Sequence, residues 1–400
     1  ALISEGRITV TALTTASDLS IASTADVFLG TINASGASVF ISAGTNITDN
    51  DNNNSSLNIL ADRLQMRAGN LIGRSDTGQS NVNLNRQAIT TQVSTLAAQA
   101  AAGIYIQERD GVTIDTVVNT VNRVNFNSSN LTNTRSLEDL TTTDNGPVLL
   151  QSLAGSIVVN GGATGGSGIN ANGTGNILLQ TLNSGTIITN ADIQSDTGNI
   201  SLASRDSLTI DQRLKTSSNG TIYLVSQGDL AINALDTNNT NLGAVASGNL
   251  SIGHIQAGTA NVSLQAGINV RDNPNLTSPL NVSASKLTII AGGRVGEADP
   301  NASPNTNSMA IVTSVGSLAV RSATGAYIQE INGLTVESIT NPLQQVLFRG
   351  NTRNQSQTLE DLTTTNNGPV KLQSLTGNIV INPGTVGSNG ISAHGTGDVL

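Results

Sequence analysis

The sequence contains no cysteine and no tryptophan, and only four phenylalanines and three tyrosines among its 400 residues. Disulfide bonds therefore contribute nothing to its stability, and a thick aromatic core is excluded. Charged residues make up 11% of the chain, against about 25% in ordinary soluble domains. The apolar residues are mostly Ile, Val, Leu and Ala, and many are β-branched, which favours thin, pleated, stacked layers.

The chain also lacks a basic surface and a long apolar run. Its formal net charge is −9 and its pI about 4.6. There is no basic stripe and no aromatic stacking platform, so we expect no nucleic-acid partner. No apolar run approaches the roughly 20 residues that a membrane-spanning helix needs, so we expect no transmembrane segment in this stretch.

Short alternating runs fill the chain instead. Apolar residues reach 37% and recur at every second position in runs such as Ile8-Thr9-Val10 and Val39-Phe40-Ile41. Gly, Asn, Asp or Ser bounds each run. This alternation predicts half-buried β-strands and argues against disorder.

The strands recur at a short period. Four runs begin at Asn199, Ser207, Thr221 and Asp229, so a pair of strands returns after 22 residues. Strands joined by Gly/Asn turns at this period predict a parallel β-helix, or β-solenoid, with rungs of about 22 residues. The AAQAAA run at 97–102 has helical propensity, but its counterpart at 319–324 reads as a strand, so we predict strands at both.

A larger repeat contains these units. The segment 137–160 recurs at 359–382, an offset of 222 residues, and Tyr105-Ile106-Gln107-Glu108 recurs at 327–330. The copies cover approximately 30–178 and 253–400, and 179–252 supplies intervening rungs. We expect residues 1–400 to be one continuous solenoid segment of a longer chain, about 85 Å long at about 4.8 Å per rung.

Four stretches break the rhythm. Residues 119–134 and 341–356 are Asn-rich and irregular, while 50–56 and 299–308 are polar. We predict that all four are loops or bulged coils that project from the solenoid, where binding specificity would reside.

The units resemble a known family. Gly198-Asn199-Ile200-Ser201-Leu202 and Ser247-Gly248-Asn249-Leu250-Ser251-Ile252 are similar to the repeats of filamentous-haemagglutinin-like exoproteins and other giant bacterial surface proteins. The resemblance covers most of the chain. It implies a right-handed β-helical fibre that is secreted, surface-associated and often adhesive, and it identifies no receptor.

The duplication tests candidate sites, because a residue that every large repeat needs should occur in both copies. His254 and His394 fail this test, since Thr31 and Asn172 occupy their counterparts; we interpret both as solvated turn residues. Four acidic pairs pass: Asp49/Asp272, Glu108/Glu330, Glu138/Glu360 and Asp139/Asp361.

None of these acidic residues predicts a catalytic, cofactor-binding or metal site. Glu138 and Asp139 would point to opposite faces of a strand, and the flanking Leu137 and Leu140 favour a structural corner. The run that starts at Asp49 resembles a calcium loop, but Asn54 and Leu60 replace its Gly and Glu. Calcium is the one cofactor that the sequence leaves open, as bridges between acidic faces. The Gly-rich strings lack the Lys-Ser/Thr of a phosphate loop.

The preferred hypothesis is a structural or adhesive, non-enzymatic segment of an extracellular, cell-surface fibre. Its partners would be copies of itself, packed laterally or end to end into a filament or sheath, or a host or neighbouring-cell surface or polysaccharide. The alternative is a β-helical carbohydrate-active enzyme, a polysaccharide lyase or hydrolase. Such an enzyme needs clustered carboxylates and aromatic sugar platforms, in which this sequence is poor.

Overall fold

The structure is a computed structural model that describes residues 1–50, 56–76, 81, 84–125, 127–217, 219–273, 280–301, 307–384 and 389–400. These residues form β-strands joined by turns. Within these ranges no helix is long and apolar enough to span a membrane. The chain divides into two compact units: unit 1 contains 1–200 and 346–352, and unit 2 contains 201–345 and 353–400.

Unit 1 contains twenty strands that lie wholly within it. They are β1 (Leu2–Ser4), β2 (Ile8–Thr14), β3 (Leu19–Ser23), β4 (Val27–Ala43), β5 (Ile47–Asp49), β6 (Ile59–Ala68), β7 (Leu71–Ile72), β8 (Ile89–Gln92), β9 (Thr95–Ala100), β10 (Gly103–Glu108), β11 (Val112–Ile114), β12 (Val117–Val124), β13 (Asn130–Leu137), β14 (Leu140–Thr142), β15 (Val148–Ser152), β16 (Ile157–Val159), β17 (Ser167–Ala171), β18 (Ile177–Thr181), β19 (Ile187–Thr189) and β20 (Asp192–Ser195).

Unit 2 contains nineteen strands of its own, and three further strands include a residue at a unit boundary. The nineteen are β22 (Leu208–Ile210), β23 (Leu214–Lys215), β24 (Thr221–Ser226), β25 (Leu230–Asp236), β26 (Asn241–Ala246), β27 (Leu250–Gln256), β28 (Asn261–Ala266), β29 (Val270–Asp272), β30 (Val282–Ala291), β31 (Arg294–Val295), β32 (Ile311–Ser322), β33 (Gly325–Glu330), β34 (Leu334–Val336), β35 (Ile339–Asn341), β38 (Gln357–Leu359), β39 (Leu362–Thr364), β40 (Val370–Ser374), β41 (Ile379–Ile381) and β42 (Ile391–Ala393). The boundary strands are β21 (Ile200–Ser204), β36 (Gln344–Val346) and β37 (Thr352–Asn354).

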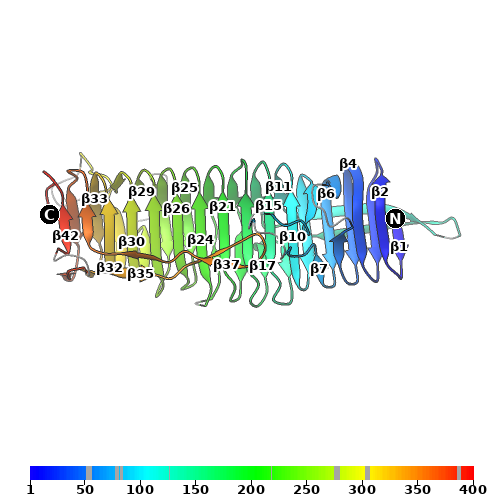
Figure 1. Ribbon diagram of the computed structural model, residues 1–400. Coiled ribbons are helices and arrows are strands. Elements are labelled where there is room, and N and C mark those ends of the chain that lie inside the picture. Colours follow the sequence, from blue (N-terminus) through cyan, green and yellow to red (C-terminus); the bar gives the residue numbers. More distant parts are fainter. Residues whose placement is uncertain are drawn as a thin grey trace. The chain divides into compact units, whose positions relative to one another are not determined.

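Parallel pairing between successive turns of the chain builds each unit (Figure 1). In unit 1, Leu19 pairs with Val39, and Val39 pairs with Leu64 on the next turn. In unit 2, Ile222 pairs with Leu242, which pairs with Val262. All of these side chains except Leu19 are fully buried. The predicted all-β parallel solenoid is therefore confirmed, and 97–100 and 319–322 are strands as predicted.

Rung length varies more than the sequence period suggests. Leu208 pairs with Leu230 and Leu242 with Val262, 22 and 20 residues apart. Elsewhere insertions at the turns lengthen the rung. Ile106 pairs with Leu150 and Ile328 with Leu372, each 44 residues apart, because these two rungs contain the insertions at 117–137 and 339–359.

Polar side chains form ladders that run from one rung to the next. In unit 2 the Asp229 carboxylate accepts a hydrogen bond from the Asn249 backbone (2.7 Å), and the Asn249 amide oxygen accepts one from Asn269 Nδ2 (3.2 Å). In unit 1 the amides of Gln107, Gln151 and Gln180 form a second ladder, with bonds of 2.9 and 2.8 Å. Each rung thereby satisfies polar groups of the next.

Two of the predicted loops are antiparallel hairpins. Hairpin 1 comprises residues 117–137, in which β12 pairs with β13. Hairpin 2 comprises residues 339–359, in which β35 pairs with β38 and β36 pairs with β37. The loop prediction was therefore wrong for 119–134 and 341–356. Most of the stretch at 50–56, and the middle of that at 299–308, lie outside the described residues.

Candidate functional site

Hairpin 1 covers outward-facing side chains of unit 1. Four of these stack in register on successive rungs and are at most 3% exposed: Ser20, Phe40, Gln65 and Ala97. Asn119 Nδ2 donates to the Ser38 carbonyl (2.9 Å), and Gln65 Nε2 donates to the Arg135 carbonyl (3.1 Å). The Arg135 guanidinium lies 4.6 Å from the centre of the Phe40 ring, a cation–π contact.

The base of hairpin 2 covers a matching column in unit 2. The column contains Tyr223, Gly243, Ser263, Thr288 and Ala319. Asn341 Nδ2 donates to the Leu242 carbonyl (3.1 Å), and Gln344 N donates to Thr221 Oγ1 (3.0 Å). Asn119 makes the same type of bond to Leu19 (3.3 Å) in unit 1. The two hairpins therefore dock on their solenoid faces through equivalent asparagines.

The tip of hairpin 2, residues 346–352, belongs to unit 1 and packs on it. Phe348 is fully buried in a cluster whose other buried members are Ala88, Tyr105, Leu149, Leu178 and Val346. Two hydrogen bonds also hold the backbone of the tip: Ser75 Oγ donates to the Arg349 carbonyl (2.8 Å), and Asn176 Nδ2 donates to the Gly350 carbonyl (3.2 Å).

The strands beneath the hairpins differ in sequence from the other solenoid strands. A strand with one solvent-exposed face alternates apolar and polar residues, whereas a strand buried on both faces carries a continuous apolar run. Val148-Leu149-Leu150, Ile177-Leu178-Leu179 and Ile222-Tyr223-Leu224 are such runs, and all nine residues are buried. These runs mark the strands on which hairpin 2 lies.

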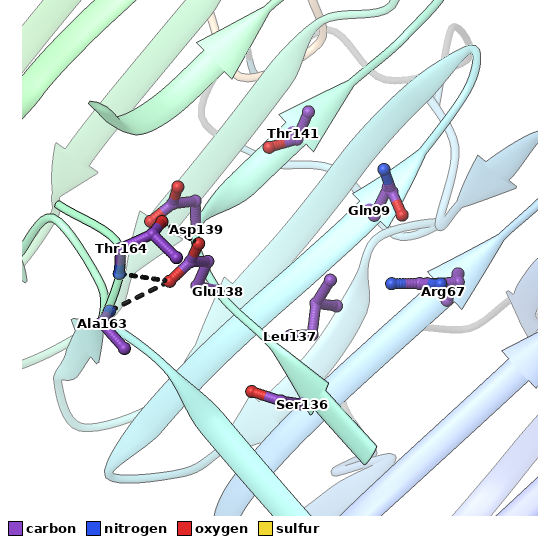
Figure 2. A pocket seen from close by; sticks show the side chains of 9 residues that line it. All are labelled: Arg67, Gln99, Ser136, Leu137, Glu138, Asp139, Thr141, Ala163 and Thr164. Atoms are coloured by element: carbon purple, nitrogen blue, oxygen red, sulfur yellow. Dashed lines mark hydrogen bonds between the residues drawn. The ribbon is translucent and has the colours of Figure 1, made fainter. Parts of the chain in front are cut away.

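A pocket of about 420 Å³ opens beside the base of hairpin 1 (Figure 2). It is lined by Arg67, Gln99, Ser136, Leu137, Glu138, Asp139, Thr141, Ala163 and Thr164. Glu138 accepts hydrogen bonds from the backbone N–H groups of Ala163 (3.0 Å) and Thr164 (3.2 Å) and from the Thr164 hydroxyl. This lining includes no aromatic ring.

Glu138 and Asp139 form the structural corner that the sequence predicts. Asp139 has a φ of 67°, and its counterpart Asp361 a φ of 64°. Asp139 Oδ1 and Asp361 Oδ1 are both buried without a hydrogen-bond partner. Burial, followed by the charges of Glu138 and Asp115, raises the pKa of Asp139 to about 6. The hydrogen bonds from the Thr164 hydroxyl and backbone lower the pKa of the partly exposed Glu138.

The acidic pair Glu108/Glu330 is internal to the solenoid. Both carboxylates are fully buried. Glu108 accepts from Thr91 Oγ1 (2.6 Å) and from the Val93 backbone (3.1 Å), and Glu330 repeats this with Thr313 Oγ1 (2.7 Å). Burial raises the pKa of Glu108 to about 8. Because no solvent reaches these carboxylates, their contacts indicate a structural role.

The pair Asp49/Asp272 is held by a buried asparagine in each copy. Asn58 Nδ2 donates to Asp49 Oδ1 (2.9 Å), and Asn281 Nδ2 donates to Asp272 Oδ1 (2.6 Å). The rest of the calcium-like run, 51–55, lies outside the described residues. Among the residues that the structure describes, no group of three or more His, Asp or Glu side chains could hold a metal ion.

The two histidines lie in different settings. His394 is exposed beside a turn, as interpreted from the sequence. His254 instead lies in β27, half-buried, with its Nδ1 2.8 Å from the Leu280 carbonyl oxygen. The turn interpretation of His254 was wrong, because the sequence pattern did not show that β27 extends past Ile252.

The chain matches no family model, no curated protein and no solved structure.

Proposed function

We propose that this chain is a structural, non-enzymatic segment of an extracellular fibre, with an adhesive role where its surface meets a target. Stacked ladders of backbone hydrogen bonds and inward aliphatic columns would make the fibre stiff and resistant to proteases. Its partners would be copies of itself, in a filament or sheath, or a cell surface or polysaccharide.

One observation carries this proposal: the chain covers its own outer faces. Both hairpins bury outward-facing columns that could otherwise line a substrate groove. Two of the four repeated acidic pairs are likewise bonded to the chain's own side chains in both copies: Glu108 and Glu330 by threonines, and Asp49 and Asp272 by asparagines. In this arrangement the side chains stabilise the solenoid, and few of them are available for catalysis.

The secreted, cell-surface location is part of the same proposal and rests on the resemblance to bacterial exoproteins. Electron microscopy of the native material, with and without a chelator, tests it. Long regular filaments of laterally packed units support a structural polymer, and thin single fibres projecting from cells support an adhesin. Compact particles, free of the surface, would refute both forms. Loss of filaments in chelator would add calcium bridges to the proposal.

A carbohydrate-active enzyme is the second candidate, because of the Glu138–Asp139 pair. Opposite pKa shifts on neighbouring carboxyl groups are how glycosidases separate a general acid from a base or nucleophile. The pocket has no aromatic sugar platform and its Arg67 is replaced by Ile290 in the second copy, which favours the structural role. Release of reducing ends from a panel of polysaccharides, lost in Glu138→Gln and Asp139→Asn, would establish the enzyme instead.

A further inference from the structure

A row of polar side chains in unit 1 begins beside the base of hairpin 1. Five outward-facing side chains stack in register on successive rungs and form what we term the polar strip: Arg67, Gln99, Thr141, Asn170 and Gln194. Arg67 is exposed and the other four are half-buried. The first three line the pocket of about 420 Å³ described above, so the strip starts in this pocket and continues beyond it.

The polar groups of the strip make no contacts with the protein's own polar groups. Within the part of the chain that the structure describes, none of the five side chains has a hydrogen-bond or ion-pair partner. Amides stacked in register can bond to each other, as the ladder of Gln107, Gln151 and Gln180 shows. The strip instead presents its donors and acceptors outward, at intervals of about 4.8 Å.

In the second copy the corresponding side chains contact hairpin 2. Ile290 replaces Arg67 and packs against a buried cluster that includes Leu359. On the preceding rung, Gln265 Oε1 accepts a hydrogen bond from Gln357 Nε2 (3.0 Å). The first copy therefore leaves open a strip that the second copy uses for docking its own hairpin.

The chemistry of the strip suits a ligand that carries hydroxyl and carboxylate groups. The planar Arg67 guanidinium can bind a carboxylate through two parallel hydrogen bonds. Gln99 and Thr141 are neutral and can both donate to and accept from hydroxyl groups. Figure 2 shows Arg67 and Gln99 on one side of the pocket and Glu138 on the other, where a ligand hydroxyl can donate to the Glu138 carboxylate.

Two other linear ligands fit the strip less well. An extended peptide commonly binds by adding a strand to a free sheet edge, but these strands are paired with a neighbouring rung on each side. A nucleic acid requires several cations along its backbone. Arg67 is the one cation of the strip, in a chain whose net charge is −9.

We propose that the polar strip binds a carboxylated polysaccharide, a polyuronate. Its sugars lie over successive rungs, with one carboxylate on Arg67 and the hydroxyl groups on the neutral side chains. The inference rests on the proposed adhesive role and specifies both the ligand class and the surface that binds it.

Isothermal titration calorimetry of the intact chain tests the ligand class. The probes are oligomers of galacturonate and of mannuronate, and neutral dextran and cellulose oligomers are the controls. The uronate oligomers should bind about tenfold or more tightly than the neutral ones, because only they bond to a charged group. Their affinity should rise with length until the oligomer covers the strip, and then remain constant.

Two arginines of β6 give a matched test of the site. Arg67→Ala should weaken uronate binding about tenfold or more. Arg63 is on the same strand, its side chain is 54% exposed, and its Nε lies 3.5 Å from Asp62 Oδ2; Arg63→Ala should leave the affinity unchanged. Arg67→Ile installs the residue of the second copy and should weaken binding as Arg67→Ala does. Circular dichroism checks that each variant is folded.

Failure of the uronate oligomers to bind would overturn the inference, and so would equal affinity for the neutral oligomers or equal effects of Arg67→Ala and Arg63→Ala. None of these results bears on the proposed structural role, which the microscopy tests. Cleavage of the bound oligomer would refute the non-enzymatic role but would support the strip as the binding surface, so the two proposals fail separately.

Discussion

Truncation of Phe348 should release the tip of hairpin 2 while the solenoid beneath it stays folded. Phe348 is fully buried among side chains that include Tyr105, Leu149 and Leu178. Replacing a buried Phe by Ala costs about 3–5 kcal/mol, from lost transfer free energy and the remaining cavity. The inward columns do not depend on this ring, so we expect the cost to appear as local opening of the hairpin.

Hydrogen exchange measures this opening directly. Within the tip, Leu347 N donates to the Asn351 carbonyl (2.9 Å) and Gly350 N donates to the Leu347 carbonyl (2.8 Å). A loss of about 3 kcal/mol corresponds to a rise of roughly a hundredfold in the opening equilibrium, and in the exchange rates of these amides. The amide of Leu224, in a core strand, should keep its protection. Leu131 in hairpin 1 is 52% exposed, and Leu131→Ala is the control for truncation of an apolar side chain.

Unchanged exchange at Leu347 and Gly350 in the Phe348→Ala chain would refute this reasoning. It would mean that the polar contacts alone hold the tip. Global unfolding would refute it in the opposite direction, because the hairpin would then belong to the same cooperative unit as the rungs.

Three further predictions concern the solenoid. Burial raises the pKa of Glu108 from 4.5 to about 8, so between these pH values the folded chain keeps a proton that the unfolded chain releases. The free energy of unfolding therefore falls as the pH rises from about 4.5 to about 8. Glu108→Gln should remove up to about 5 kcal/mol of this fall, measured by denaturant unfolding at about pH 4 and about pH 9. Asn58→Ala removes a buried amide that bonds Asp49 and two carbonyls, and should lower the unfolding free energy by about 2–4 kcal/mol in the same assay. Gly243→Val places a Cβ 2.6 Å from Leu343 Cδ1, so it should loosen the base of hairpin 2 by about 1–3 kcal/mol and admit protease cleavage there.

Exposed positions serve as controls for these substitutions. A Cβ at Gly6 would have Ser4 Oγ at 3.9 Å as its nearest neighbour, so Gly6→Ala should leave protease resistance unchanged. Asn70 is exposed, and Asn70→Ala should cost less than about 0.5 kcal/mol. A pH profile for Glu108→Gln that parallels that of the unmodified chain would show that Glu108 is ionised in the folded state.

The inward columns were predictable because one rule produces them at every rung. Alternation places Ile222 and Leu224 on the same face of a strand, and stacking brings Leu242 into register with Ile222. Because this rule is local and applies at every rung, the pattern in one rung supports the strand prediction for the next. Exact rung lengths were not predictable, because turns absorb insertions without disturbing the columns.

The hairpins were harder to predict because their stability depends on what lies beneath them. Residues 341–356 are rich in Asn, Gln and Arg and have low intrinsic strand propensity. They form strands because Asn341, Leu343 and Phe348 meet a surface contributed by rungs far away in the sequence. The corner at Glu138 and Asp139 was accessible from the spacing of Leu137 and Leu140, but the buried oxygen of Asp139 was not.

The position of hairpin 2 in the chain has a consequence for the order of folding. Its tip contacts residues made much earlier, such as Ser75, which lies 274 residues before Arg349. As the chain emerges, the column of Tyr105, Leu149 and Leu178 therefore remains bare until residue 348 arrives. Closing such a long loop is slow, and a bare apolar strip is prone to capture the wrong segment. Related hairpins in one molecule, or in neighbouring molecules, would then compete for the same strip, so the sequence differences between the tips help to decide which hairpin ends on which face.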